Sequence, residues 1–427
     1  MTPAAPRAAV DVAPETPSRR TRALAAVALL LVAANLRPAI VAISPLLPEI
    51  RSATGLSATL GGLLTTLPVA CFGAFAFLTP RLTARLGRER LVVAVLALLT
   101  AGICVRLLAG TVALFVGTTF AGAAIAVGNV ALPGLIKRDF PHHVALMTGC
   151  YATALTTGAA LAAGLSVPLG RATGLGWRGV LGLWAIPAAV ALAVALPLVR
   201  AADRREPEAA PPPALAGLWR DRVAVVVTSY MGLQSMVFYA SIAWLPSLFR
   251  SDGVSAGAAG WLVSYTGFIS IPSALATPLI GRRLRSGWPL VAAASLLGTV
   301  GVVALIVDAS GLAVVSMTAL GLGSGMSLSL ALGFIALRGR DAHRVSQLST
   351  LAQGGGYVLA AVGPLAVGAL HQVTGGWDAP LVVLAALLAI EIPVGIAAAR
   401  DRFVSGSPPG TRGTEGRVRA RPTGTPR

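Results

Sequence analysis

Apolar residues occur in blocks along this chain, and short polar segments separate one block from the next. The blocks are about 18 residues or longer, which is enough for an α-helix to cross the hydrocarbon core of a bilayer. Only helices and closed barrels span lipid, because every backbone polar group must be satisfied internally. Since the blocks are too long and too uniformly apolar for barrel strands, the pattern predicts an all-α, multi-pass membrane protein.

The pattern predicts twelve transmembrane helices, which fall into two sets of six. They cover residues 23–43, 58–78, 91–109, 112–136, 144–168, 179–199, 223–244, 257–279, 289–307, 311–336, 347–370 and 379–399. Residues 200–222 contain DRREPE and PPP, which indicates a charged, helix-breaking linker. We therefore expect six-helix bundles at 23–199 and 223–399. Residues 1–22 and 400–427 are rich in Pro, Gly, Ala and Arg, and we expect them to be disordered.

Composition and charge agree with this topology. Hydrophobic residues make up 55% of the chain and charged residues 12%, whereas soluble domains carry about 25% charged residues. Of the 34 basic residues, 28 fall on the side of the two termini, five fall on the other side, and Arg37 lies within a span. Cytoplasmic loops hold the excess of Lys and Arg, so both termini are expected to be cytoplasmic. Topology thus explains the net charge of +18 without nucleic acid, and the cytoplasmic (inner) membrane of a bacterium is the expected location.

The two halves resemble each other in sequence. At an offset of 198, Leu47-Pro48 corresponds to Leu245-Pro246, and Thr79-Pro80 corresponds to Thr277-Pro278. Because each half has an even number of helices, the repeats have the same orientation. Two parallel six-helix repeats describe the major facilitator architecture, in which the substrate lies near the midplane between the halves.

The stretch Ala33–Glu49 contains the first candidate site. Arg37 lies well within an apolar run, next to Asn35, and Pro38 removes a backbone donor at the same level. An arginine at this depth costs about 2.5–3.5 kcal/mol on insertion scales and usually faces protein or water. We interpret the stretch as part of a polar binding site inside the bundle; the alternative is that Arg37 snorkels to the headgroups.

Further polar and aromatic side chains are expected at the same depth in other helices. Together with Arg37, the candidate substrate-binding residues are Asn35, Asn129, Tyr151, Gln234, Tyr239, Gln353 and Tyr357. Amides donate and accept hydrogen bonds, tyrosines offer flat walls, and arginine binds planar anions. This set suits a small, planar or anionic solute, although Asn129, Gln234 and Gln353 could instead join helices by hydrogen bonds.

Glu391 is the carboxylate deepest within a predicted span, and we consider it a candidate proton carrier. The alternatives are that it pairs with an unidentified partner or that it faces a packed interior. The sequence contains no nucleotide-binding, metal-binding or hydrolytic motif at the required spacing. We therefore expect no enzymatic activity, no cofactor and no metal.

Several segments together resemble one known family. They are NLRPA at Asn35–Ala39, LLPEIR at Leu46–Arg51, GLLTTLPVACFGAFA at Gly62–Ala76, GNVALPGLIKRDFP at Gly128–Pro141, MGLQSMVFYASIAWLP at Met231–Pro246 and AQGGGYVLAAVGPL at Ala352–Leu365. The combination is similar to the cyanate and 2-nitroimidazole transporter branch of the major facilitator superfamily, over residues 23–399. The resemblance implies alternating access by two rocking bundles and movement of a small solute such as cyanate or a nitroimidazole.

One loop departs from the superfamily pattern. The usual G-x-L-a-D-R-x-G-R-R between helices two and three is replaced by residues 80–89, which lack the first Gly and the Asp but keep Arg85, Gly87 and Arg88. In the superfamily this Asp helps to latch the outward-facing state. The resemblance therefore implies a weakened latch, or one replaced by Asp139.

The sequence thus predicts a monomeric secondary active transporter for a small anionic or planar polar solute, with the bilayer as a further partner and H⁺ as the candidate coupling ion. Two alternatives remain open. One is a broad-specificity efflux transporter for drugs or metabolites, and the other is a non-transporting membrane sensor.

Overall fold

The computed structural model describes residues 19–202, 217–284 and 286–404. Within these ranges the regular structure consists of sixteen α-helices and one short 3-10 helix, η1. The first half contains α1 (Arg19–Asn35), α2 (Pro38–Val41), α3 (Ile43–Thr54), α4 (Ala58–Ala76), α5 (Thr79–Leu86), α6 (Arg88–Val105), α7 (Thr111–Asp139), α8 (Val144–Thr173), α9 (Trp177–Leu183) and α10 (Ala185–Ala202). The second half contains η1 (Leu218–Arg220), α11 (Arg222–Ser251), α12 (Ala256–Gly281), α13 (Trp288–Val307), α14 (Ala313–Arg338), α15 (Ala342–Thr374) and α16 (Asp378–Ala399).

Every predicted transmembrane segment lies on a helix or a broken helix. Ten described helices are long and apolar enough to cross a membrane, and the bent pair Leu60–Ala76 and Thr79–Leu86 makes an eleventh span. The remaining predicted segment corresponds to α6, whose first turn contains Arg88, Glu89 and Arg90 and which packs against α7 and α10. Because of these three charged residues, composition alone does not identify α6 as a membrane-spanning helix.

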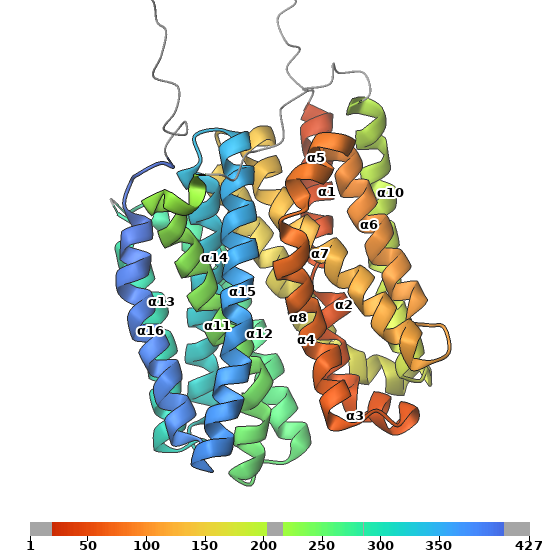
Figure 1. The fold of residues 1–427 in the computed structure, drawn as a ribbon, viewed down its shortest axis with the longest axis vertical. Coiled ribbons are helices and arrows are strands. Elements are labelled where there is room, and N and C mark those ends of the chain that lie inside the picture. Colours follow the sequence, from red (N-terminus) through yellow and green to blue (C-terminus); the bar gives the residue numbers. More distant parts are fainter. Residues whose placement is uncertain (1–18, 203–216, 285, 405–427) are drawn as a thin grey trace, which may run out of the picture.

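The helices form two groups that stand side by side with their axes roughly along the longest dimension of the molecule (Figure 1). Helices α4, α7 and α8 of the first group pack against α12, α14 and α15 of the second. Both described chain ends, Arg19 and Val404, lie at the same end of the molecule (Figure 1). We call this end the terminal end and the other the distal end.

Some residues of the segments predicted to be disordered have a defined structure. Helix α1 begins at Arg19, within the segment 1–22, so its first residues are helical. At the other terminus, Val404 is buried and its backbone N–H donates to the carbonyl of Arg338, which holds residues 400–404 against the bundle. Most of the predicted linker, residues 203–216, lies outside the described residues, as do residues 1–18 and 405–427.

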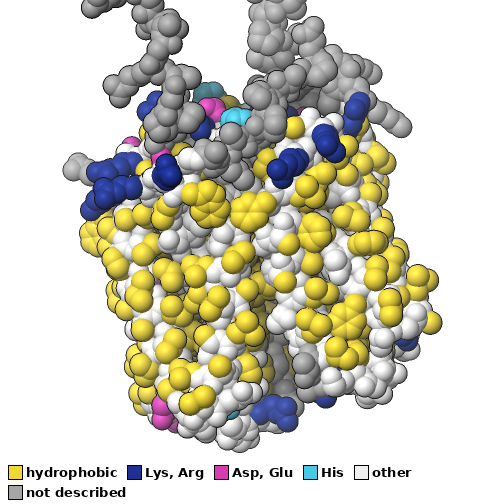
Figure 2. All heavy atoms as spheres, viewed as in Figure 1, with side chains coloured by type: hydrophobic (Ala, Val, Ile, Leu, Met, Phe, Trp, Pro, Cys, Tyr) yellow, Lys and Arg dark blue, Asp and Glu magenta, His cyan; other side chains and the backbone are white. Residues whose placement is uncertain are grey.

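The outer surface of the bundle is apolar between its two ends, and basic side chains gather mainly at the terminal end (Figure 2). Large hydrophobic side chains such as Leu365, Val314 and Val382 are more than half exposed, which would be unfavourable in water. Helix α13 has 20 residues, and at 1.5 Å per residue it is about 30 Å long, the thickness of the hydrocarbon core. The surface is therefore the lipid-facing surface of a multi-pass membrane protein.

Candidate functional site

The first apolar helix breaks at the position that the sequence singles out. Helix α1 ends at Asn35, α2 begins at Pro38, and Arg37 lies between them. Proline has no N–H, and its ring clashes with the carbonyl group of the preceding helical turn. The series of helical hydrogen bonds is therefore interrupted here. Gly158 of α8 allows a close approach at the break, because a Cβ atom at this position would lie 2.1 Å from the Ala34 carbonyl oxygen.

The break directs Arg37 toward the second half of the molecule. Its guanidinium Nη1 donates a 2.8 Å hydrogen bond to the Tyr239 hydroxyl on α11, and only 8% of the residue is exposed. Tyr357 of α15 and Tyr151 of α8 also lie within electrostatic range of the guanidinium. Among the described residues Arg37 forms no ion pair with a carboxylate. A buried cation surrounded by three neutral phenols is therefore left without a counter-charge.

Aromatic rings continue this cluster across the interface between the halves. The ring of Tyr357 lies 6.3 Å from that of Tyr239 and 4.9 Å from that of Phe72 on α4, centroid to centroid. Phe238 contacts Tyr239 edge-on at 5.3 Å. These rings give the site flat, apolar walls next to the guanidinium.

A second polar cluster, built on Asn129, lies on the terminal side of Arg37. The Tyr151 hydroxyl donates to Asn129 Oδ1 at 3.4 Å, and Gln353 Nε2 donates to the Asn129 carbonyl at 2.6 Å. Ser349 Oγ donates to the neighbouring Val130 carbonyl at 2.8 Å. Helix α7 is thus joined to α15 by hydrogen bonds between the halves. Asn129 Nδ2 and Gln353 Oε1 are buried without a partner among the described residues, so one donor and one acceptor remain unused.

Two predicted site residues lie apart from these clusters. Asn35 Nδ2 donates to the carbonyls of Leu31 and Pro187, which fixes α1 against α10. Gln234 Nε2 donates to the Met231 carbonyl and to Ser235 Oγ within its own helix. In this conformation both amides have structural hydrogen bonds and neither contacts Arg37.

Arg106 is a buried charge near the end of the predicted span 91–109, and the sequence prediction counted it among the five basic residues of the side opposite the termini. It follows α6 and is 1% exposed, and its Nη1 donates to the carbonyl of Ala39 in α2. Its Nε and Nη2 have no partner among the described residues. The residue therefore supports the break that carries Arg37. Its position at the end of an apolar run gave no sign of this role.

Glu391 is buried in the second half, with 1% of its surface exposed. Ser327 Oγ of α14 donates to Glu391 Oε1 at 2.8 Å, and the Tyr230 ring of α11 lies close enough to interact electrostatically. No described Lys, Arg or His pairs with this carboxylate. Unlike Arg37, whose hydroxyl partner comes from the opposite half, Glu391 interacts with Ser327 and Tyr230 of its own half.

The loop between the second and third spans lacks the Asp of the superfamily pattern, and an ion-pair group lies beside it. Asp139 does not reach Arg85 or Arg88; its carboxylate binds the neighbouring Arg138 at 2.6 Å. Arg138 in turn pairs with Glu89, which follows the loop, at 2.7 Å. Gly87 adopts a positive φ of 75°, a conformation that glycine permits at the turn. A Glu89–Arg138–Asp139 group thus joins α6 to the end of α7, within the first half.

Comparison with known proteins places this architecture in a family. Residues 23–361 match the model of the Major Facilitator Superfamily. The chain is 39% identical to the uncharacterized transporter YycB of Bacillus subtilis (strain 168), over 88% of this chain and 93% of the relative. It is 37% identical to the 2-nitroimidazole transporter of Escherichia coli (strain K12), over 91% and 98%. It is 28% identical to the cyanate transport protein CynX of the same organism, over 82% and 90%.

A solved structure supports the same fold. The E. coli fucose:proton symporter FucP superimposes with a TM-score of 0.67 at 14% sequence identity, covering 89% of this chain and 98% of that one. At this identity the likeness concerns the fold alone. Fold, family model and full-length relatives agree: the chain is a multi-pass membrane transporter, not an enzyme, and belongs to the major facilitator superfamily in the branch of the cyanate and 2-nitroimidazole transporters.

Proposed function

We propose that this protein is a secondary active transporter that moves a small anionic or planar polar solute, of the size and chemistry of cyanate or a nitroimidazole, by alternating access. The observation that carries the proposal is Arg37, a buried guanidinium at a helix break with three tyrosines around it and no described carboxylate partner. Burying an unpaired charge is costly, and a bound anion would supply the missing counter-charge. The same solute class appears in the names of two relatives, the 2-nitroimidazole transporter and the cyanate transport protein CynX.

The geometry suggests how such a solute would bind. An anionic or electron-rich group takes the place of the Tyr239 hydroxyl at the Arg37 guanidinium, which offers a planar fork of donors. The ring of Tyr357 provides a flat wall. Asn129 Nδ2 and Gln353 Oε1, which have no described partner, complete the hydrogen bonds. Because Arg37 and Asn129 belong to the first half and Tyr239, Gln353 and Tyr357 to the second, one small solute contacts both.

We assign the protein to the bacterial cytoplasmic membrane with both termini in the cytoplasm. Its relatives are bacterial, and basic side chains gather at the terminal end (Figure 2), as the positive-inside rule requires of a cytoplasmic face. Proton coupling through Glu391 is part of the proposal, since this buried carboxylate has no described cationic partner.

The test is ligand-induced thermal stabilisation of the purified protein in detergent. Cyanate, nitrate, small carboxylates and 2-nitroimidazole are each titrated against wild type, Arg37→Ala and Arg171→Ala. Arg171 is an exposed arginine at the distal end of α8. The Arg171→Ala variant is therefore the control for the loss of one positive charge away from the site. A hydrogen bond to a charged group contributes about 1.5–3 kcal/mol, so Arg37→Ala is expected to weaken anion binding roughly 10- to 150-fold, with no change in Arg171→Ala.

Two outcomes separate the alternatives. Stabilisation by small anions that disappears only in Arg37→Ala supports the proposal. Stabilisation by a broad range of neutral aromatic compounds, unchanged in Arg37→Ala, would contradict it and favour an efflux transporter in which Arg37 is structural.

A further inference from the structure

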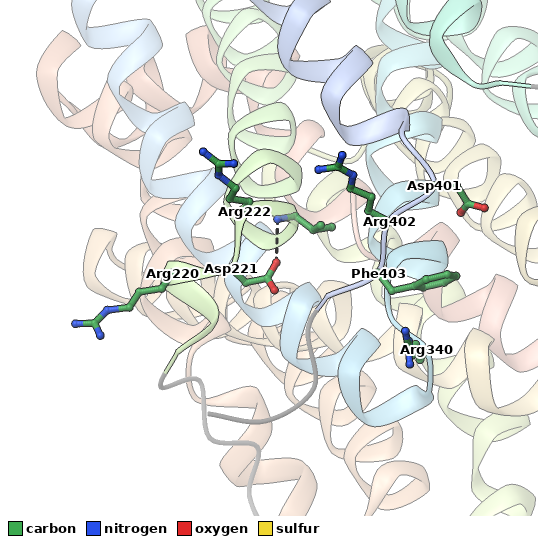
Figure 3. A pocket seen from close by; sticks show the side chains of 8 residues that line it. Arg220, Asp221, Arg222, Arg340, Asp401, Arg402 and Phe403 are labelled. Carbon is green, nitrogen blue, oxygen red and sulfur yellow. Dashed lines mark hydrogen bonds between the residues drawn. The ribbon is translucent and has the colours of Figure 1, made fainter. Parts of the chain in front are cut away.

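A pocket at the terminal end of the second half is separate from the Arg37 cluster. Its volume is about 600 Å³, and it is formed where three segments meet: the end of η1 with the start of α11, the turn after α14, and the stretch that follows α16. Its lining consists of Arg220, Asp221, Arg222, Val223, Arg340, Asp401, Arg402 and Phe403 (Figure 3). Neither the transport proposal nor the comparisons assign a role to these residues.

Positive charge predominates in this pocket. Four guanidinium groups face two carboxylates, and both carboxylates are already engaged. Asp221 caps α11 by accepting from the N–H groups of Val223 and Ala224 at 2.8 and 3.0 Å, and Asp401 pairs with Arg338 at 2.9 Å. Arg338 lies outside the lining and its charge balances Asp401. The four arginines of the pocket are therefore opposed by the Asp221 carboxylate alone among the lining residues, and positive charge remains in excess.

The pocket arginines have few partners of their own. Arg220, Arg222 and Arg402 are exposed and form no ion pair with a described residue, while Arg340 lies over the Phe403 ring at 5.6 Å. Arg222 and Arg402 extend on either side of the pocket in the same general direction, whereas Arg220 points away at its rim (Figure 3). Arg222 is also at the N-terminus of α11, where the helix dipole adds positive potential.

The frame of the pocket is fixed by the bundle. Arg338 donates to the carbonyls of Ala398 and Ala399 at the end of α16, at 3.1 and 2.8 Å. The N–H of Val404 donates to the Arg338 carbonyl at 3.0 Å, and Val404 is 3% exposed. These contacts hold Arg402 and Phe403 opposite the start of α11.

We propose that this pocket binds a phosphate group, carried either by an anionic phospholipid of the surrounding leaflet or by a soluble phosphate compound. Arginine forks match phosphate oxygens in geometry and charge. The exposed aromatic side chains Trp219 and Phe403 lie at the same end of the molecule, and aromatic residues favour the headgroup level of a membrane. Basic pockets at this level are suited to phospholipid headgroups.

The experiment uses the full-length protein and the double variant Arg222→Gln/Arg402→Gln. The matched control is Arg282→Gln/Arg283→Gln, which removes the same charge from exposed residues after α12, outside the pocket. One arm measures stabilisation by phosphatidylglycerol added to phosphatidylcholine–detergent micelles. The other titrates inorganic pyrophosphate in detergent alone. At about 1 kcal/mol per arginine near a charged surface, the pocket variant is expected to bind roughly 30-fold more weakly, and the control to bind like wild type.

The arms distinguish the two sources of phosphate. Stabilisation by phosphatidylglycerol that only the pocket variant loses supports a lipid site, and the same result with pyrophosphate supports a soluble ligand. If the pocket variant and its control respond equally in both arms, binding is general surface electrostatics and the proposal fails. All variants in this experiment keep Arg37, so its outcome does not depend on the outcome of the Arg37→Ala experiment.

Discussion

At the scale of single residues, two buried ionisable side chains carry the proposed function, Arg37 and Glu391. Arg37 has a neutral hydroxyl partner from the opposite half at 2.8 Å, whereas Glu391 has a hydroxyl partner from its own half at 2.8 Å. Neither has an oppositely charged partner among the described residues. Such groups at membrane depth are expensive and are usually functional. The contrast in their partners suggests different roles: Arg37 for the solute and Glu391 for a proton.

Glu391→Gln tests the second role. Glutamine keeps the shape and can still accept the hydrogen bond from Ser327, but it cannot exchange a proton. In proteoliposomes we expect the variant to retain exchange of labelled solute between the two sides, while accumulation driven by a pH gradient is lost.

Ser327→Ala serves as the control, because it removes the hydrogen bond but leaves the carboxyl group. Unchanged gradient-driven accumulation in Glu391→Gln would mean that the carboxyl group has a packing role only.

At the scale of elements, the broken first span is the feature on which the site depends. Residues 19–54 form three helices rather than one. Arg37 lies at the break between α1 and α2, so its side chain does not follow the direction set by either helix. The carbonyl of Ala39 accepts a hydrogen bond from Arg106, the residue that follows α6. Backbone groups freed by a break in a membrane helix must be satisfied by neighbours, and here a buried arginine does so.

Arg106→Met is expected to destabilise the break. The side chain keeps most of its volume but leaves the Ala39 carbonyl without its donor, which costs about 1–3 kcal/mol in a buried position. We expect a lower unfolding temperature in detergent and weaker ligand binding at Arg37.

Arg171→Met, at an exposed position, is the control and should leave both quantities unchanged. If Arg106→Met is as stable as wild type or more stable, desolvation of the guanidinium outweighs its hydrogen bond, and the support of the break must come from packing alone.

At the scale of the whole molecule, hydrogen bonds between the halves occur on the terminal side of Arg37. Ser349 and Gln353 of α15 reach the backbone of α7 there. Gly134 of α7 lies against Ser346 of α15, so that a Cβ atom at Gly134 would be 3.5 Å from the Ser346 Cβ. In an alternating-access mechanism these contacts must separate when the terminal side opens.

A disulfide at this contact should therefore stop transport. The Cβ separation of 3.5 Å falls at the short end of the range for disulfides. In a background with Cys71, Cys104 and Cys150 replaced by serine, Gly134→Cys/Ser346→Cys is expected to lose transport on oxidation and to regain it on reduction.

Each single cysteine variant should transport normally under both conditions. Full transport by the oxidised double variant, with the cross-link verified by mass spectrometry, would show that this contact does not open.

The sequence by itself determined the features that follow from local pattern. The apolar blocks specified the spans, because a bilayer of fixed thickness requires helices of a given length. It also identified the break, since Pro38 lacks an N–H whatever the surroundings. Of the eight predicted site residues, Arg37, Tyr239, Tyr357, Tyr151, Asn129 and Gln353 lie in two adjoining clusters, whereas Asn35 and Gln234 bond elsewhere.

Only the tertiary structure decided which polar side chains meet. Asn35 and Arg37 are two residues apart, yet one bonds α1 and α10 and the other bonds α11, because side-chain direction depends on the local helical register. The role of Arg106 required the residue after α6 to reach the Ala39 carbonyl of α2, and the basic pocket required three segments distant in sequence to meet. Local composition determines which segments lie within the membrane. The hydrogen-bond partner of each polar side chain depends instead on the packing between helices that are far apart along the chain.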